Sequence, residues 1–179
     1  MNYNLRSLNF KEILGKVKAF VFDVDGVLSR SVLNLDDSGE FIRTTNVKDG
    51  YILKYAKRKG FVIGIISGGN NENIIKRFHN LGIEDVIIKS KRKVADMEIF
   101  LEKYNLRYED VLYMGDDIPD LEIMQKVGLP CCPNDAVTEI KEISVYISKL
   151  NGGEGCVRDI VEQVLRTHGK WMDNDSFET

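Results

Sequence analysis

The sequence predicts an α/β fold built on a doubly wound, mostly parallel sheet. Two patterns favour this fold. Four short apolar runs each have the length of a buried strand: residues 19–22, 61–66, 85–88 and 111–114. Stretches with helix start and stop signals follow these runs, and glycines mark several of the stops. Strands that alternate with helices indicate βαβ units, and hence a parallel sheet covered by helices.

The composition is that of one globular domain, which we expect to span residues 1–179. With 43% hydrophobic and 30% charged residues, the chain can form a full core. A net charge of -3 gives no footprint for nucleic acid or an anionic membrane, and no apolar run approaches the roughly 20 residues of a membrane span. The chain starts without a signal-peptide pattern, and its three cysteines form neither a disulfide framework nor a zinc spacing. We therefore expect a cytoplasmic protein.

The individual elements follow from local signals. In order, we expect a helix over 2–15, a strand over 19–22, a β-hairpin flap at about 31–45, a helix over 46–59, a strand over 61–66, a helix over 72–81, a strand over 85–88, a helix over 93–104, a strand over 111–114, a helix over 121–127, short edge strands over 129–132 and 145–147, and a final helix from the Gly152-Gly153 turn to about Arg166. The hairpin prediction depends on alternation around Asp36-Asp37-Ser38-Gly39. Asn46, with Asp49 three residues later, is an N-cap signal for the helix that follows. The polar tail, about 167–179, has no predicted element.

Two carboxylates directly follow the first strand. Asp23 and Asp25 are two positions apart, and Gly26 behind them lets the chain turn sharply. In sheets of this kind, ligands bind outside the carboxyl ends of the strands. Two like charges so close raise each other's pKa unless a cation lies between them. An oxygen-only set of ligands predicts magnesium as that cation.

Other chemically active side chains follow the later strands. Ser67 ends the second strand, Lys93 comes after the third, and a group of three acids follows the fourth: Asp116, Asp117 and Asp120. One crevice at the carboxyl edge of the sheet could collect all of them. Carboxylates that hold a metal, with a hydroxyl and a lysine that hold phosphoryl oxygens, predict phosphoryl transfer on magnesium.

These motifs resemble a known family. Asp23-Val-Asp-Gly-Val27, Ser67-Gly68, Lys93 and Gly115-Asp116 with Asp120 match, in order, the four motifs of the haloacid dehalogenase-like phosphotransferases. The resemblance runs from about Lys18 to Arg166 and implies a Rossmann-like fold. It implies that Asp23 is the nucleophile that forms an aspartyl-phosphate, and that Asp25 is first the acid and then the base. It also implies that Mg²⁺ is held by Asp23, Asp116 and the main-chain carbonyl of Asp25.

The resemblance assigns supporting roles as well. Ser67, the amide of Gly68 and Lys93 would hold the phosphoryl oxygens. Asp117 would complete the outer shell of the metal, and Asp120 would position Lys93 or Asp116. Taken singly, these residues have plainer interpretations: Lys93 lies in a charge run that is usually a solvated face, and Asp117 and Asp120 suit a helix start.

A finer resemblance depends on the absence of a cap. Too few residues separate the motifs for an inserted cap domain, and the segments 46–50 and 152–158 resemble the phosphatases of 3-deoxy-D-manno-octulosonate 8-phosphate, a precursor of lipopolysaccharide. This resemblance implies a small sugar acid phosphate as substrate, with Lys48 and Arg158 as candidate substrate residues. Arg158 would bind the substrate carboxylate, or would simply face solvent on the last helix. It also implies a homotetramer, in which a neighbour's surface and tail close the site. The chain departs from that group at Gly69, often arginine there, at Lys89, usually glycine, and at Ser29-Arg30-Ser31, often Thr-Asp-Gly.

Other functions stay open from the sequence. The substrate could be a nine-carbon ulosonate 9-phosphate or another sugar phosphate. A phospho-accepting signalling receiver also places acids, a hydroxyl and a lysine at strand ends. Asp25 argues against a receiver, because an acid/base two residues past the nucleophile would remove the phosphoryl group. A catalytically dead assembly module is the third alternative, and the complete set of carboxylates disfavours it.

Overall fold

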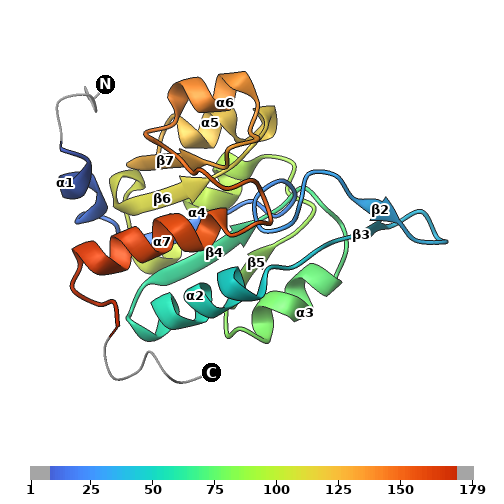
Figure 1. The fold of residues 1–179 in the computed structure, drawn as a ribbon, viewed down its shortest axis with the longest axis horizontal. Coiled ribbons are helices and arrows are strands. Elements are labelled where there is room, and N and C mark those ends of the chain that lie inside the picture. Colours follow the sequence, from blue (N-terminus) through green and yellow to red (C-terminus); the bar gives the residue numbers. More distant parts are fainter. Residues whose placement is uncertain (1–8, 173–179) are drawn as a thin grey trace.

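The computed structural model describes residues 9–172, in which a six-stranded sheet lies between two layers of helices (Figure 1). The strands are β1 (Ala19–Phe22), β4 (Val62–Ile66), β5 (Asp85–Ile87), β6 (Val111–Met114), β7 (Leu129–Cys132) and β8 (Tyr146–Ile147). Their order in the sheet is β5-β4-β1-β6-β7-β8, and all five pairings are parallel. The predicted fold class is confirmed. One detail is wrong: β7 was expected at an edge, but it lies between β6 and β8 and all four of its residues are buried.

The helices are α1 (Phe10–Leu14), α2 (Val47–Arg58), α3 (Asn73–His79), α4 (Lys93–Tyr104), α5 (Leu121–Met124), α6 (Thr138–Ile143) and α7 (Cys156–Thr167). Two 3₁₀ turns, Tyr108–Asp110 and Ile118–Asp120, precede β6 and α5. The sequence prediction missed α6, because only Ile140 of its six residues is buried and no side-chain N-cap announces it. The predicted helix 121–127 is shorter than expected, and half of the predicted helix 2–15 lies outside the described residues.

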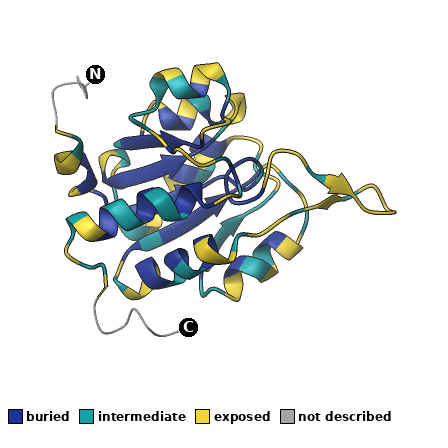
Figure 2. Ribbon diagram, viewed as in Figure 1, coloured by how far each residue is buried: buried dark blue, intermediate teal, exposed yellow. Residues whose placement is uncertain are grey.

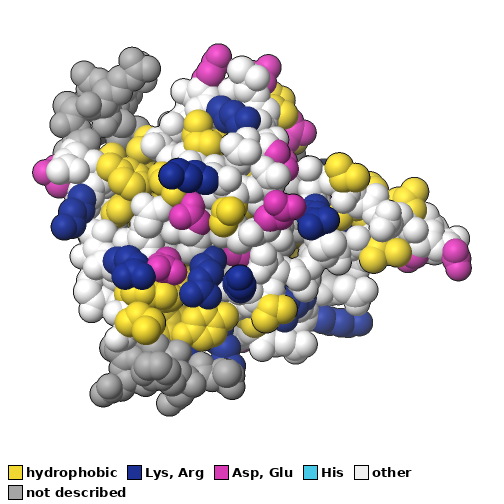
Figure 3. All heavy atoms as spheres, viewed as in Figure 1, with side chains coloured by type: hydrophobic (Ala, Val, Ile, Leu, Met, Phe, Trp, Pro, Cys, Tyr) yellow, Lys and Arg dark blue, Asp and Glu magenta, His cyan; other side chains and the backbone are white. Residues whose placement is uncertain are grey.

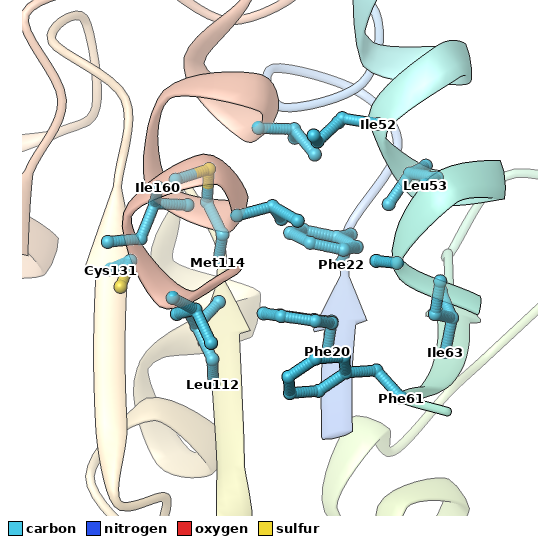
Figure 4. Packing of buried hydrophobic residues seen from close by; sticks show 14 of the residues in the cluster. Phe20, Phe22, Ile52, Leu53, Phe61, Ile63, Leu112, Met114, Cys131 and Ile160 are labelled. Carbon is cyan, nitrogen blue, oxygen red and sulfur yellow. The ribbon is translucent and has the colours of Figure 1, made fainter. Parts of the chain in front are cut away.

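The core forms because successive β1 side chains point to opposite faces of the sheet. Phe20 and Phe22 pack against α2 and α7 (Figure 4), in a cluster that also includes α1 and α3. Ala19 and Val21 point to the other face, where α4, α5 and α6 cover them. With both faces covered, the central strand is apolar throughout and every one of its residues is buried (Figure 2).

The hairpin is the main feature outside this sandwich. β2 (Asn34–Leu35) and β3 (Phe41–Ile42) pair antiparallel, as predicted, and project away from the sheet (Figure 1). The carboxylate of Asp36 organises the turn, since its Oδ1 accepts hydrogen bonds from the backbone of Ser38 and Glu40. Most of the ribbon is exposed (Figure 2). Apart from this hairpin, no cap-like insertion occurs in residues 9–172.

The chain after α7 packs at the amino end of the strands. The ring of His168 lies 5.1 Å from that of Phe61, which precedes β4, and the indole of Trp171 meets the ring of Tyr55 edge-on at 5.6 Å. The hydroxyl of Tyr55 donates to the carbonyl of Lys170 (2.9 Å). Residues 167–172 therefore lie at the opposite end of the sheet from Asp23. Within the described part of the chain, no helix has the length and apolar character needed to cross a membrane.

Candidate active site

The predicted motifs meet at the carboxyl edge of the sheet. Main-chain hydrogen bonds hold the loops together there: the amide of Asp23 donates to Met114 (3.1 Å), and that of Ser67 donates to Ile87 (2.9 Å). The loop after β5 returns to the second motif, because the amide of Ser90 donates to the carbonyl of Ser67 (3.0 Å). These contacts bring the ends of β1, β4, β5 and β6 to one place.

Lys93 is the buried cation of the site. Its Nζ lies 2.9 Å from Oδ2 of Asp23 and 2.6 Å from Oδ1 of Asp120. Burial lowers the pKa of Lys93, but the two carboxylates outweigh it and the pKa is raised, so the ammonium is charged. The charge run around Lys93 therefore contains one inward-facing member, placed by the first turn of α4.

Asp120 connects the other members. Its Oδ1 also accepts from the hydroxyl of Tyr113 (2.5 Å), and its Oδ2 accepts from the amide of Asp116 (3.2 Å). Asp120 is buried, and Gly115 lets it approach, because a Cβ at Gly115 would lie 2.4 Å from its Cγ. Asp120 thus contacts both residues that it was expected to position. Tyr113 was not anticipated, since a tyrosine inside an apolar strand carries no local sign of a polar role.

Three carboxylates form an acidic cluster suited to a metal. One oxygen each of Asp23, Asp116 and Asp120 lies within 4.8 Å of the others. Burial, followed by the charge of Asp120, raises the pKa of Asp23 to about 7; burial and Asp23 raise the pKa of Asp116 to about 8. Such carboxylates ionise together only beside a cation, and oxygen-only donors suit Mg²⁺. Gly26 is part of the fit: its φ is +84°, and a Cβ there would lie 1.9 Å from Oδ2 of Asp116.

Asp25 has a partner that the sequence did not reveal. Its carboxylate accepts two hydrogen bonds from the guanidinium of Arg43, one from Nε to Oδ1 and one from Nη2 to Oδ2, each 2.7 Å long. Arg43 follows β3 of the hairpin, 18 positions along the chain. No motif marks it, and only the hairpin's return toward the sheet brings it here.

The second-motif loop presents a hydroxyl and amides. Ser67 is buried and its Oγ accepts from the amide of Gly69 (3.1 Å), while Gly68 is exposed. The amide of Lys89 donates to the carbonyl of Gly69 (2.8 Å). Lys89 has φ +59°, a left-handed conformation that favours glycine.

Three of the predicted residues are not brought into the cluster. Asp117 is exposed and caps the 3₁₀ turn through the amide of Ile118 (2.8 Å), which matches its plainer interpretation. Lys48 is exposed in the first turn of α2. The guanidinium of Arg158 lies over the rings of Tyr51 (5.6 Å) and Trp171 (5.7 Å).

The carboxylate of Asp49 has a partner far along the chain. Asn46 does cap α2, but Oδ1 of Asp49 accepts from the amide of Arg158 at the start of α7 (2.7 Å). Burial raises the pKa of Asp49 to about 6. The acid therefore joins α2 to α7, a long-range contact that local spacing cannot reveal.

This arrangement defines a class of protein: an α/β protein with a metal-assisted phosphoryl-transfer site, in which a buried carboxylate lies beside a lysine and an acidic cluster. The chain belongs to the haloacid dehalogenase-like hydrolase family, whose family model matches residues 29–128. The resemblance inferred from the motifs is confirmed.

Comparison with known proteins narrows the class to one group of phosphatases. The 3-deoxy-D-manno-octulosonate 8-phosphate phosphatase of Escherichia coli K12 is 32% identical over 154 residues, which cover 86% of this chain and 82% of that protein. The crystal structure of the Yersinia pestis phosphatase of this name has a TM-score of 0.86 at 27% identity, covering 89% of this chain and 86% of that one. That of Moraxella catarrhalis, in complex with magnesium ion, phosphate ion and a KDO molecule, has a TM-score of 0.84 at 27% identity, covering 88% and 90%. The chain is homologous to these phosphatases, so its magnesium dependence follows from the family and from the acidic cluster.

Proposed function

We propose that this protein removes the phosphate from 3-deoxy-D-manno-octulosonate 8-phosphate, in the synthesis of a lipopolysaccharide precursor. The observation that carries the proposal is the pairing of buried Asp23 with Lys93 beside an acidic cluster, in a chain homologous to phosphatases of this substrate. Asp23 offers a carboxylate to a phosphoryl group, and Lys93 offers a charge to its oxygens.

The reaction proceeds in two displacements. Oδ of Asp23 attacks phosphorus, the bond from phosphorus to the sugar oxygen breaks, and Asp25 gives its proton to the leaving alkoxide. Water then attacks the phosphorus of the aspartyl-phosphate and Asp25 takes a proton from that water. The bond from phosphorus to Oδ of Asp23 breaks, which releases phosphate and restores the carboxylate. Ser67, the amide of Gly68 and Lys93 hold the phosphoryl oxygens throughout.

The carboxylates of the acidic cluster have different roles. Asp23 and Asp116, with the main-chain carbonyl of Asp25, would hold Mg²⁺, which supplies charge neutralisation for the carboxylates and the phosphoryl group. Asp120 supports them instead, because both its oxygens already accept hydrogen bonds. Asp117 would reach the metal only through its outer shell.

We propose that a second copy of the chain closes the site. Displacement through a charged transition state works best with bulk water excluded, and this fold has no cap. The hairpin exposes several large apolar side chains: Val32 by 86%, Leu35 by 59%, Phe41 by 50% and Ile42 by 53%. Figure 3 shows hydrophobic side chains on the part that projects from the sheet. A monomer rarely exposes such a ribbon, so we propose a closed homotetramer. We also propose that the protein is located in the cytoplasm, because its three cysteines are free.

The tail also enters this proposal. We propose that the tail covering Asp23 comes from another subunit, and the position of residues 167–172 at the amino end of the sheet supports this. Truncation after Met172 keeps Trp171 in place and should preserve the oligomer while changing turnover or substrate affinity. Light scattering and kinetics on this variant test the model; a fully active monomer, indifferent to loss of the tail, contradicts it.

The substrate itself is tested by phosphate release. We expect the highest kcat/KM for 3-deoxy-D-manno-octulosonate 8-phosphate among a set of sugar phosphates with and without a carboxylate, and none without Mg²⁺. A nine-carbon ulosonate 9-phosphate is the alternative substrate. It stays open because Gly69 and Lys89, two positions at which the chain differs from the pattern of the resembled phosphatases, lie beside the proposed phosphoryl site. A higher kcat/KM for that compound would replace the proposed substrate, and single-turnover labelling without turnover would indicate a receiver.

A further inference from the structure

Arg43 joins the hairpin to the catalytic acid through only part of its guanidinium. The Nε and Nη2 edge holds both oxygens of Asp25, and the side chain is 11% exposed. The ring of Phe41 supports the group from a centroid distance of 5.7 Å. An arginine has five N–H donors, so a second edge, Nη1 with the other hydrogen of Nη2, is available for another planar anion.

The nitrogen Nη1 lacks a partner. It is buried and finds no acceptor among the described residues. A buried donor without an acceptor is destabilising, so the site is complete only when an oxygen reaches this nitrogen. Arg43 follows a two-stranded ribbon, and such a ribbon is marginally stable alone. A small shift of the ribbon can therefore uncover the second edge of the guanidinium without disturbing the core.

A cavity of about 370 Å³ lies beside Arg43, between the hairpin and α3. This volume falls in the usual range for a small-molecule site, about 300–1,000 Å³. Apolar side chains, among them Phe41, Ile42 and Phe78, form much of its lining. The polar part, which includes Arg43, Thr44, Asn71, Asn73 and Arg77, suits a polyol with an acidic group. Asp36 is the one carboxylate of the lining, and its Oδ1 is already bonded within the hairpin turn.

Gly69 leaves room for the guanidinium. A Cβ at position 69 would lie 2.8 Å from Nη2 of Arg43 and 3.2 Å from Oγ of Ser67. The missing side chain therefore allows Arg43 to lie between Asp25 and the second-motif loop.

We propose that Arg43 binds the carboxylate of the leaving group with this second edge while its first edge holds Asp25. The proposal rests on the proposed function. One guanidinium then sets the position of the acid relative to the sugar oxygen that receives its proton, and the cavity holds the sugar. The hairpin residue thereby selects sugar acid phosphates over neutral sugar phosphates.

The experiment measures selectivity. The two substrates are 3-deoxy-D-manno-octulosonate 8-phosphate and its C1-reduced analogue, in which CH₂OH replaces the carboxylate. A charge-assisted bidentate contact predicts that wild-type kcat/KM favours the acid by roughly 10- to 200-fold. Arg43→Ala should reduce that ratio to within about threefold of unity, and Arg43→Lys should recover little of it, because an ammonium lacks the fork. Arg107→Ala removes an equally charged, 72% exposed side chain and should leave the ratio unchanged.

Each outcome decides the proposal. An unchanged ratio in Arg43→Ala, with both values of kcat/KM lowered equally, means that Arg43 only positions Asp25, and overturns it. If the inhibition constant of Arg43→Ala for inorganic phosphate rises by the same factor as kcat/KM falls, Arg43 contacts the phosphoryl group. This outcome also overturns the proposal. If the wild-type protein hydrolyses neither compound, the proposed function fails and this inference with it; hydrolysis of the acid with an unchanged ratio refutes this inference alone.

Discussion

Magnesium binding should release protons from the acidic cluster. With their pKa values raised to about 7 and about 8, Asp23 and Asp116 are both partly protonated at pH 7. A divalent cation requires both carboxylates to be ionised, while Lys93, with its raised pKa, keeps its proton. We therefore expect on the order of one proton to leave per Mg²⁺ bound at pH 7, and clearly fewer at pH 9, where both carboxyl groups are mostly ionised already.

Titration calorimetry measures this release directly. The binding heat at each pH is compared in two buffers with different ionisation enthalpies, and the difference counts the protons. Asp116→Asn should lower the count at pH 7, whereas Asp36→Asn, which alters a hairpin-turn carboxylate outside the cluster, should not. Equal proton counts at pH 7 and pH 9, or none at pH 7, would refute the assignment of raised pKa values to these two acids.

The same linkage acts on stability. Both carboxyl groups have folded-state pKa values above the unfolded value of 3.8, so the folded protein binds more protons than the unfolded chain between pH 4 and pH 8. The free energy of unfolding of the metal-free protein should therefore fall as pH rises through this range. Raising the pKa of Asp23 from 3.8 to about 7 corresponds to roughly 4 kcal/mol, an upper bound because Asp116 and Lys93 share the cluster. Thermal melts with and without Mg²⁺ should differ more at pH 8 than at pH 5.

Three further predictions concern single residues. Asp23→Asn should lower kcat by orders of magnitude, because an amide is neither a nucleophile nor an anionic ligand; a variant that keeps a tenth of the wild-type turnover would exclude Asp23 as the nucleophile. Asp25→Asn should still bind Mg²⁺ yet slow both half-reactions. Asp116→Ala should instead bind Mg²⁺ more weakly and recover activity at high Mg²⁺. Identical Mg²⁺ dependence of the two variants would contradict their separate roles. Lys89→Gly should raise the free energy of unfolding by about 0.5–1 kcal/mol. Glycine removes roughly 1–2 kcal/mol of left-handed strain from the folded state, and the greater entropy of the unfolded chain cancels part of this gain. Denaturant melts measure the change, and a decrease would show that the lysine side chain stabilises the loop.

Much of the site could be predicted from the sequence, because its parts are local. Asp23 and Ser67 each follow an apolar run directly, Asp116 follows one after a single glycine, and the carboxyl ends of parallel strands share one edge. The local sequence alone does not identify Lys93 as the buried lysine, because its neighbours in the chain are also charged. The burial of its side chain is set by α4 packing on the sheet, so only the fold separates it from the exposed Lys91 and Arg92.

By itself, the sequence determined the parallel α/β sheet, the order of its motifs and the need for a divalent cation. Strand length, helix stops and the spacing of like charges are properties of short segments, and they act wherever those segments lie. The tertiary structure alone decided the partners of the charged side chains. Arg43 meets Asp25 across 18 positions, and the amide of Arg158 meets Asp49 across 109. Contacts of this kind have no periodicity or motif to announce them, because they exist only where the hairpin and α7 fold back to the carboxyl edge of the sheet.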